Sequence, residues 1–267
     1  MTDPLVSIVI PTFNSEEFLE QCLKSIRTQN HRNTEIILVD NCSRDKTELI
    51  GKKYGALFVN VRAKRSEARN IGARSSKGKM LLFLDSDMEL ASNVISACVK
   101  KAKRGYDAII IPEISVGEGF WSRCRALEKV CYLGDDLIEA ARFFPKTTFE
   151  NIHGFDPALE ACEDWDLTSR TKMAGYRIGR IQEFARHHEG RLSLKEAMSK
   201  KRWYGKTAWL YKKKHPTEAK HQLGLVRPAL IKNWRKLATD PIHATGLLFL
   251  KSCEFNAMEL GRLAIIL

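Results

Sequence analysis

The sequence predicts an α/β protein in which a mostly parallel sheet is flanked by helices and followed by a helical extension. Over the first 112 residues, short β-branched apolar runs alternate with segments of helical spacing. That alternation is typical of βαβ units. The length of 267 residues suits one large domain, or one and a half, with a sizeable core. Apolar residues make up 44% of the chain and charged residues 28%, which is the composition of a soluble globular protein.

Each apolar run in this first part ends at a polar or turn residue, which indicates buried strands joined by helices. Strands are expected over residues 5–10, 35–39, 56–61, 80–84 and 108–111. A helix starts near Ser15, where Phe18, Cys22 and Ile26 make an apolar stripe. Further helices are expected over 66–75 and 93–103.

The pattern changes after residue 112. A helix is expected over 120–141, then extended segments and a turn over 142–155, a helix over 167–174 that ends at Gly175, a strand over 177–181, and a long basic helix over 193–214. From these elements we predict a catalytic domain over 1–190. Its nucleotide-binding half covers 1–112 and its acceptor half 113–190, and a helical, basic and amphipathic region follows over 191–267.

The net charge of +12 belongs to one region. Residues 180–236 contain 16 Lys plus Arg and 4 Asp plus Glu, and the remainder contains 28 of each sign. A region this basic could face nucleic acid, anionic lipid headgroups or a phosphorylated substrate. The seven cysteines lack CxxC spacing, which indicates reduced thiols in a cytosol-like compartment and neither a disulfide framework nor a zinc site.

The last segment, 242–267, is mostly apolar, but polar residues recur at intervals of two or three positions. They are Lys251, Glu254, Asn256, Glu259 and Arg262. The segment is therefore expected to be a helix that packs on the core or lies in a membrane interface. The basic, aromatic-rich helix before it favours the membrane surface. No run of about 18 apolar residues predicts a membrane span, and no signal peptide is recognised at the N-terminus.

Two carboxylates stand where the strand over 80–84 must end, in the sequence Leu84-Asp85-Ser86-Asp87. An open α/β sheet binds ligands at the carboxyl ends of its strands. Mg²⁺ and Mn²⁺ bind oxygen ligands, and substrate phosphates often supply some of those oxygens. Asp85 and Asp87 are therefore candidate metal ligands, although a solvated loop with two capping acids would give the same pattern.

Other polar residues also follow strands or open helices. Asp40 ends the second strand and could accept a hydrogen bond from a nucleotide base or ribose, or cap a helix. Arg69 and Asn70 lie at the start of a helix whose dipole favours phosphate, although a solvated basic face would also explain an arginine there. Glu163 and Asp164 open another helix, as capping acids or as a general base.

Taken in order, the motifs are more specific than any one of them. They are PTFN, VDNCSRDKT, SEARNIGA, FLDSDM, NIHGFDP and CEDWDLTSRTKMAGY. Over residues Pro4 to Gly205 the chain resembles the family 2 glycosyltransferases, which have a GT-A fold. The resemblance implies a nucleotide-diphosphate sugar as donor, bound to UDP or GDP, with Mn²⁺ or Mg²⁺ as cofactor.

The resemblance also assigns roles to residues. It implies nucleotide contacts by Pro11, Thr12, Asn14 and Asp40, with Arg69, Asn70 and Asp85 on the donor side. Asp87 would be the more direct metal ligand of the two aspartates, joined by His187, although His188 fits the same spacing. Asp164 would be the catalytic base, with Glu163 as the fallback. The expected reaction is one in-line displacement that inverts the anomeric centre.

One departure from the family bears on the product. Processive synthases of this family carry QxxRW and several membrane spans, whereas this chain has Arg202-Trp203 without the glutamine. We therefore expect transfer of a single sugar. The stretch Lys200–Lys214 resembles members that act on polyprenyl-linked acceptors, which implies an enzyme held peripherally at the cytoplasmic face of a membrane, with no nucleic acid partner.

Three other interpretations compete. A nucleotidyltransferase would need a Gly-rich loop with a basic residue after the first strand, and PTFNSEE supplies neither. A nucleic-acid or anionic-lipid binding protein would use the basic region but leave both carboxylate pairs unexplained. A non-catalytic sugar-nucleotide binder would not need the carboxylate pairs that this chain retains.

Overall fold

The computed structural model describes the backbone of residues 3–266 and the side chains of residues 3–264. The chain forms two compact units. The first, here called the sheet unit, contains Met1–Pro112, Ala140–Pro157 and Asp164–Arg186. The second, here called the helical unit, contains Glu113–Glu139, Ala158–Glu163 and His187–Leu267.

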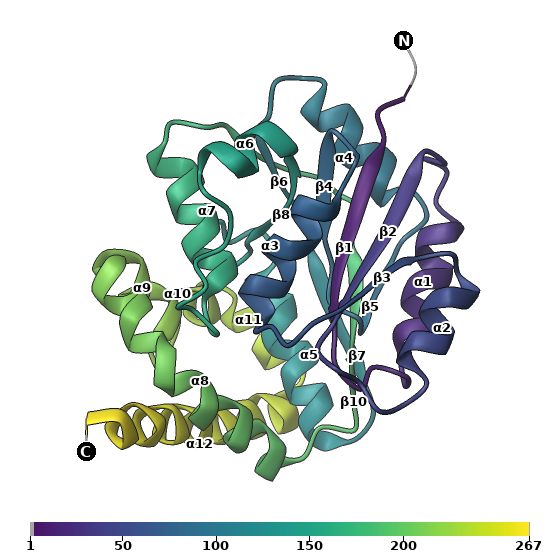
Figure 1. The fold of residues 1–267 in the computed structure, drawn as a ribbon. Coiled ribbons are helices and arrows are strands. Elements are labelled where there is room, and N and C mark those ends of the chain that lie inside the picture. The colour runs from purple at the N-terminus through teal and green to yellow at the C-terminus, as the bar shows by residue number, and fades with distance from the viewer. Residues whose placement is uncertain (1–2, 267) are drawn as a thin grey trace. The chain divides into compact units, whose positions relative to one another are not determined.

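A seven-stranded sheet forms the centre of the sheet unit (Figure 1). Its strands, in spatial order, are β3 (Leu57–Asn60), β2 (Thr34–Asp40), β1 (Val6–Thr12), β4 (Met80–Phe83), β8 (Ala141–Pro145), β6 (Ala108–Ile110) and β9 (Ile178–Arg180). Only β8 runs antiparallel to its neighbours. Thr12 lies opposite Asp40 and Val9 opposite Phe83, so β1, β2 and β4 end at the same edge.

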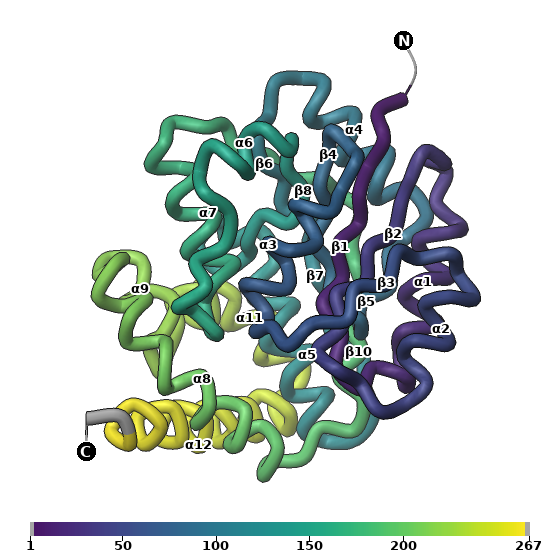
Figure 2. Tube along the Cα trace, viewed as in Figure 1, coloured from purple at the N-terminus to yellow at the C-terminus, as the bar shows by residue number. Residues whose placement is uncertain are grey.

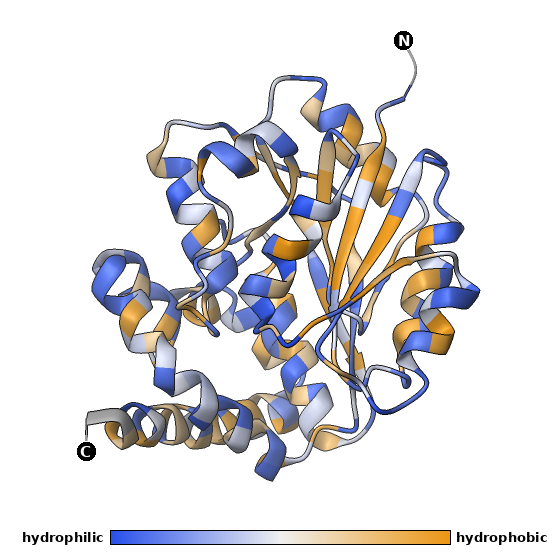
Figure 3. Cartoon of the chain, in the orientation of Figure 1, coloured by the Kyte–Doolittle hydropathy of each residue, from blue (hydrophilic) through white to orange (hydrophobic). Residues whose placement is uncertain are grey.

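Helices cover both faces of this sheet because its central strands are apolar on both sides (Figure 3). Ile8 and Ile10 of β1 share a cluster with apolar residues of α1 (Leu19–Arg27) and α4 (Val94–Ala102). Val9, on the opposite face, shares a cluster with residues of α3 (Arg65–Ser75), α6 (Lys146–Asn151) and α7 (Glu163–Met173). Gly72 lets α3 approach closely, since a Cβ there would overlap the side chain of Val9.

The remaining elements complete the two units. The sheet unit also contains α2 (Thr47–Lys53) and β5 (Met88–Leu90), and β10 (Ala185–Gly190) begins in it and ends in the helical unit. The helical unit contains β7 (Glu113–Gly117), α5 (Phe120–Tyr132), α8 (Leu194–Lys214), α9 (Pro216–Leu223), α10 (Pro228–Lys232), α11 (Trp234–Ala238) and α12 (Pro241–Ile266).

The two long helices of the helical unit, α8 and α12, lie side by side (Figures 1 and 2). Ser193 caps α8 in a capping box with Glu196, which fixes where this helix begins. Gly205 of α8 faces the backbone of Met258, and Gly261 of α12 faces that of Arg202. A Cβ at either glycine would overlap a backbone carbonyl, so these two positions set the close approach of the helices.

A group of charged side chains is buried between α5 and α12. Glu128 lies 2.9 Å from Lys251 Nζ, accepts a hydrogen bond of 2.6 Å from the Tyr132 hydroxyl, and pairs with Arg125. Arg125 also pairs with Glu254. Burial by itself would raise the pKa of Glu128, but the positive charges of Lys251, Arg125 and Arg227 hold that pKa well below its usual range.

This arrangement bears on the expected polar stripe of the last helix. A helix forms over Pro241–Ile266 and packs on α8 and α5. Lys251 and Glu254 are buried in the ion group, whereas Asn256 is exposed, so the polar residues do not make one solvated face. Within residues 3–266, no helix combines the length and apolar character needed to cross a membrane.

The expected fold class is confirmed, with a mostly parallel sheet between helices and helices at the C-terminal end. The helix expected over 120–141 is wrong in its extent. It ends at Tyr132, Gly134 follows with a φ of 86°, and Ala141 already belongs to β8. Residues 142–155, expected to be extended, contain the short helix α6. The aromatic residues of this segment pack in the core. Such residues occur in strands and in helices, so the sequence pattern does not distinguish the two.

We predict that Glu128→Gln destabilises the protein by about 3–5 kcal/mol, because Arg125 and Lys251 are buried and the substitution leaves Glu254, among the described residues, as the one carboxylate between them. Urea unfolding followed by circular dichroism measures the change, and Glu118→Gln, at an exposed position of the same unit, should shift it by less than about 0.5 kcal/mol.

The pH dependence follows from the lowered pKa of Glu128. Its ionised form stabilises the fold above the ordinary carboxyl pKa of about 4.5. That stabilisation is lost as the pH falls toward the lower pKa of the folded state. Stability should therefore fall in acid more steeply in the wild type than in Glu128→Gln, and equal slopes would contradict the role given to this carboxylate.

Candidate active site

The candidate site lies at the carboxyl edge of the sheet, where the strand order changes direction. The chain proceeds from β1 outward to β2 and β3, then returns to place β4 on the other side of β1. The helices that make these crossovers, α1 and α3, lie on opposite faces of the sheet. Such a switch point leaves an open crevice outside the strand ends, and ligands bind there in open α/β sheets.

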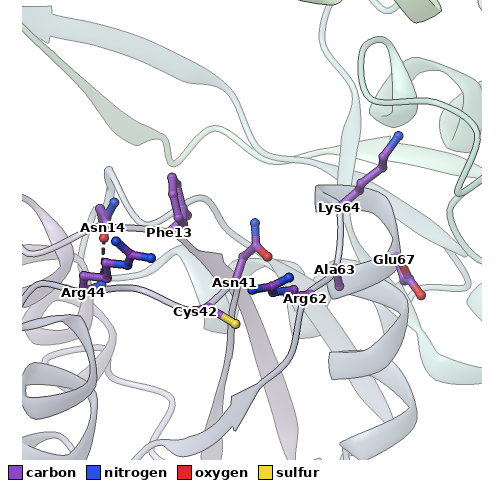
Figure 4. Close-up of a pocket in the computed structure, with 9 residues that line it drawn as sticks. All are labelled: Phe13, Asn14, Asn41, Cys42, Arg44, Arg62, Ala63, Lys64 and Glu67. Carbon is purple, nitrogen blue, oxygen red and sulfur yellow. Dashed lines mark hydrogen bonds between the residues drawn. The ribbon is translucent and has the colours of Figure 1, made fainter.

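A cavity of about 670 Å³ opens at the ends of β1, β2 and β3 (Figure 4). Asn14, Phe13 and Arg44 lie on one side, Arg62, Ala63, Lys64 and Glu67 on the other, with Asn41 and Cys42 between them. Three basic side chains face one acidic side chain, so the lining favours an anionic ligand. The volume lies within the range of small-molecule sites.

Asp40 organises the loops under this cavity. Its side chain is 1% exposed and accepts hydrogen bonds from the Thr12 hydroxyl (2.8 Å), the Ser43 N–H (2.7 Å) and the Ser43 hydroxyl (2.6 Å). Because this side chain is almost fully buried, a direct contact between Asp40 and a nucleotide would require the loops around it to move.

The other expected nucleotide contacts of the first strand differ in position. Asn14 lines the cavity, with a φ of 48°, and its side chain accepts a hydrogen bond of 3.0 Å from the Arg44 N–H. Thr12 is buried, and Pro11 lies within β1 opposite Val39. Of the expected contacts in β1 and the loop after it, Asn14 is therefore the one that reaches the cavity.

Two arginines and two aspartates form the second part of the site, here called the arginine–aspartate cluster. Arg69 has no exposed surface, and it donates to Asp164 Oδ1 (2.8 Å) and to Asp85 Oδ1 (2.7 Å). Arg142 Nη2 lies 3.4 Å from Asp85 Oδ2 and 4.0 Å from Asp164 Oδ2. The two aspartate side chains keep 24% and 25% of their surface exposed, so both can reach a ligand.

Hydrogen bonds through the Thr168 hydroxyl hold the segments of Arg142 and Asp164 together. The Ala141 N–H donates to Thr168 Oγ1 over 3.0 Å, and that hydroxyl donates to the Asp164 carbonyl over 2.7 Å. These bonds join the start of β8 to the start of α7. Arg142, next to Ala141, is therefore held beside Asp164.

Asn70 was expected at the donor side of the site, and its amide is used in the loop before Asp156. It donates to the Phe155 carbonyl (2.8 Å) and accepts from the Phe155 N–H (2.9 Å). This pair of bonds fixes a turn in which His153 and Gly154 both have a φ of 62°. Asn70 therefore joins the SEARNIGA and NIHGFDP motifs.

Asp87 is half-buried in the loop after β4, near Cys22. Burial raises the pKa of the Cys22 thiol, and the negative charges of Asp87 and Asp85 raise it further. Among the described side chains, no group of three or more His, Cys, Asp or Glu could hold a metal ion. A divalent cation bound by Asp87 and Asp85 would take further oxygen ligands from a bound phosphate, as is common for Mg²⁺.

The remaining expected residues lie in the helical unit. Glu163 is 3% exposed, whereas its neighbour Asp164 is a quarter exposed. His187 and His188 are half-buried in β10, and His187 Nδ1 lies 3.9 Å from Glu113 Oε2.

Sequence reasoning missed several residues of the site. Arg142 was not singled out because nothing in its local sequence marks an arginine at the start of a strand as a partner of distant carboxylates. Phe13, Arg44, Arg62 and Lys64 line the cavity but belong to loops or a helix start. The available signal was a phenylalanine directly after the first strand and beside polar residues, and in the structure Phe13 is 60% exposed.

The comparisons with known proteins agree with this geometry. A family model, described as glycosyl transferase family 2, matches residues 7–158. An uncharacterized glycosyltransferase of Haemophilus influenzae is 26% identical over 209 residues, which cover 71% of this chain and 71% of that protein. A GalNAc(5)-diNAcBac-PP-undecaprenol beta-1,3-glucosyltransferase of Campylobacter jejuni is 34% identical over 114 residues, which cover 39% of this chain and 36% of that protein.

Solved structures share the fold. The mannosyltransferase PcManGT of Pyrobaculum calidifontis, in complex with GDP-Man and Mn²⁺, aligns with a TM-score of 0.68 at 18% identity and covers 98% of this chain and 88% of its own. S. aureus TarS 1-349, in complex with UDP, aligns with a TM-score of 0.56 at 16% identity and covers 98% of this chain and 91% of its own.

We predict that Asn70→Ala lowers the free energy of unfolding by about 1–3 kcal/mol, because the buried backbone groups of Phe155 lose their partners. Thermal unfolding measures the loss. Asn256→Ala, which removes an exposed amide bonded to one helix carbonyl, is the matched control and should change stability little. Equal effects of the two substitutions would show that Asn70 does not hold the turn.

Proposed function

The chain belongs to glycosyltransferase family 2 and is a glycosyltransferase, and from this premise we propose that it moves one sugar from a UDP- or GDP-sugar to a hydroxyl of a lipid-linked glycan. The observation that carries the proposal is the meeting of two features at one sheet edge. A cavity lined by three basic residues lies at the ends of β1 to β3, and the arginine–aspartate cluster lies beyond the end of β4.

The cavity is suited to the nucleotide. The exposed ring of Phe13 offers an apolar face to the base, and Asn14 and Asn41 offer amides to its polar edges or to the ribose. Arg44, Arg62 and Lys64 would attract the diphosphate. Asp40 and Thr12 support this site from below by fixing the loop after β2.

A divalent cation, Mn²⁺ or Mg²⁺, fits at the end of β4. Asp87 would be its main protein ligand, as the family's pattern implies, and Asp85, whose two oxygens lie beside arginines, would bind next to it. His187, with His188 as the alternative, is proposed as a further ligand on the family's pattern alone, since the described side chains do not bring three such groups together. The bound cation would offset negative charge on the leaving diphosphate.

Asp164 is proposed as the general base. Arg69 holds its Oδ1, and its Oδ2 lies farther from Arg142, at 4.0 Å, so Oδ2 is the oxygen placed to take the acceptor proton. The acceptor oxygen then forms a bond to the anomeric carbon as the bond from that carbon to the phosphate oxygen breaks. A single displacement inverts the anomeric centre. Glu163, being almost fully buried, is the less suitable base.

The proposed acceptor is a glycan on a polyprenyl carrier. The Campylobacter relative is named for a substrate linked to undecaprenol through diphosphate. We propose that the enzyme reaches such an acceptor by binding the cytoplasmic membrane surface peripherally.

We predict that UDP or GDP raises the melting temperature only when Mn²⁺ is present, and that Asp87→Asn removes most of the shift. A ligand at a hundred times its dissociation constant adds about 2.7 kcal/mol, which is roughly 5 °C or more for a chain of this size. Glu48→Gln, at an exposed carboxylate of α2, should keep the full shift. If neither nucleotide stabilises the wild type with any metal, the donor site is not where we place it.

We predict that Asp164→Asn lowers kcat by about 10²–10⁴-fold while nucleotide binding stays unchanged, because the substitution removes the proton acceptor and keeps the shape. Sugar release and transfer assays measure kcat, and thermal shift with nucleotide and Mn²⁺ measures binding. Glu163→Gln is the matched comparison. A larger loss in Glu163→Gln than in Asp164→Asn would assign the base to Glu163.

A further inference from the structure

Exposed apolar side chains are concentrated on the helical unit. Among the described residues, the large hydrophobic side chains exposed on the sheet unit are Phe13, Leu49, Leu57 and Met173. The helical unit exposes Phe120, Val130, Trp203, Leu225, Val226, Ile231, Trp234, Ile242, Leu248, Phe249, Leu260 and Leu263. Contiguous apolar surface on a protein marks a binding site for a partner or a membrane.

The most concentrated part is the stretch from Leu225 to Ile242. Ile231 is 65% exposed, Trp234 60% and Ile242 70%, and Leu225 and Val226 are exposed as well. From Lys220 to Thr239 the sequence contains no acidic residue, and Asp240, which lies 2.7 Å from the His243 ring, is the one acidic residue from there to Ile242. Its basic residues are Lys220, Arg227, Lys232, Arg235 and Lys236. This stretch is therefore both apolar and positively charged.

The packing of helices α10 and α11 on α5 keeps these side chains out of the core. Ala229, Leu230 and Leu237 pack into the apolar cluster that contains Cys131 of α5. The Asn233 side chain donates to the Cys131 carbonyl over 3.0 Å and ties the junction of the two helices to α5. With this face fixed inward, Ile231, Lys232, Trp234 and Arg235 are presented to solvent.

We propose that this surface docks the protein on an anionic lipid bilayer, with Leu225, Val226, Ile231, Trp234 and Ile242 entering the headgroup region and Lys232 and Arg235 contacting lipid phosphates. Tryptophan favours the boundary between water and hydrocarbon. Basic side chains favour the anionic cytoplasmic leaflet. The Arg235 guanidinium lies 5.8 Å from the centre of the Trp234 ring, so the apolar and basic groups act at the same spot.

The chemistry of the surface favours lipid over nucleic acid. Bases stack on aromatic rings, but four of the five exposed apolar side chains here are aliphatic and offer no ring. Aliphatic groups beside basic ones are the composition of helices that lie in a membrane interface. The inference rests on the proposed function in one respect, since a lipid-linked acceptor gives the enzyme its reason to be at a bilayer.

The test is cosedimentation of the full chain with vesicles of phosphatidylcholine, with and without phosphatidylglycerol. We expect binding to the vesicles that contain phosphatidylglycerol and much weaker binding to phosphatidylcholine alone. Lys232→Gln with Arg235→Gln should weaken binding roughly 25-fold, about fivefold for each charge removed. Ile231→Ser with Trp234→Ser should weaken it at least tenfold, about 1.4 kcal/mol.

Matched variants on the sheet unit control for general effects of charge and apolar surface. Lys100→Gln with Arg104→Gln removes two exposed charges, and Leu49→Ser with Met173→Ser removes two exposed apolar side chains. Both controls should bind vesicles as the wild type does. Thermal shift with UDP or GDP and Mn²⁺ on every variant confirms that folding and the donor site are intact.

The proposal is overturned if the wild type ignores vesicles with phosphatidylglycerol at low salt, or if the docking variants bind as the controls do. It is also overturned if those variants lose affinity for short RNA or DNA while vesicle binding stays unchanged. Failure of nucleotide binding with vesicle binding preserved would instead count against the proposed glycosyl transfer, so the two failures are distinct.

Discussion

The site of this protein depends on one buried cation. Arg69 has no exposed surface and reaches two carboxylates, Asp85 after β4 and Asp164 at the start of α7, which are far apart in the sequence. A buried guanidinium is costly unless each side is paired, so its burial obliges both segments to come together. Arg142 adds a second positive charge beside the same two acids. The sheet edge is fixed by this pairing as much as by apolar packing.

The chain contains a second group of buried ions. It differs from the arginine–aspartate cluster in the exposure of its acids, which decides whether a ligand can reach them. In the helical unit, Glu128 and Glu254 are 2% exposed and are enclosed by Arg125 and Lys251, so no ligand reaches them. In the arginine–aspartate cluster the arginines are buried but the acids are a quarter exposed. The first group holds helices together, and the second can also meet a substrate.

Several residues of the sequence motifs stabilise the loops around the cavity and do not line the cavity themselves. Asp40 binds Thr12 and Ser43, and Asn70 binds the backbone of Phe155. The cavity is lined instead by side chains such as Arg44, Arg62 and Lys64, which stand on the loops that those motif residues shape. Short polar side chains are suited to this work, because they satisfy backbone groups where a strand ends.

The order of strands and helices in the sheet unit can be predicted from the sequence alone, since apolar periodicity and strand-end residues are local signals. The sequence also marked Asp85, Asp87 and Asp164 as acids at element ends. It could not determine that Arg69 and Arg142 meet those acids, or that Lys251 and Glu254 turn inward, because each depends on residues far along the chain. The helix expected to reach residue 141 failed for the same reason: β8 is a strand because β4 and β6 offer it hydrogen bonds. Long-range pairing of strands and charges is decided only in the tertiary structure, where desolvation makes unpaired groups costly.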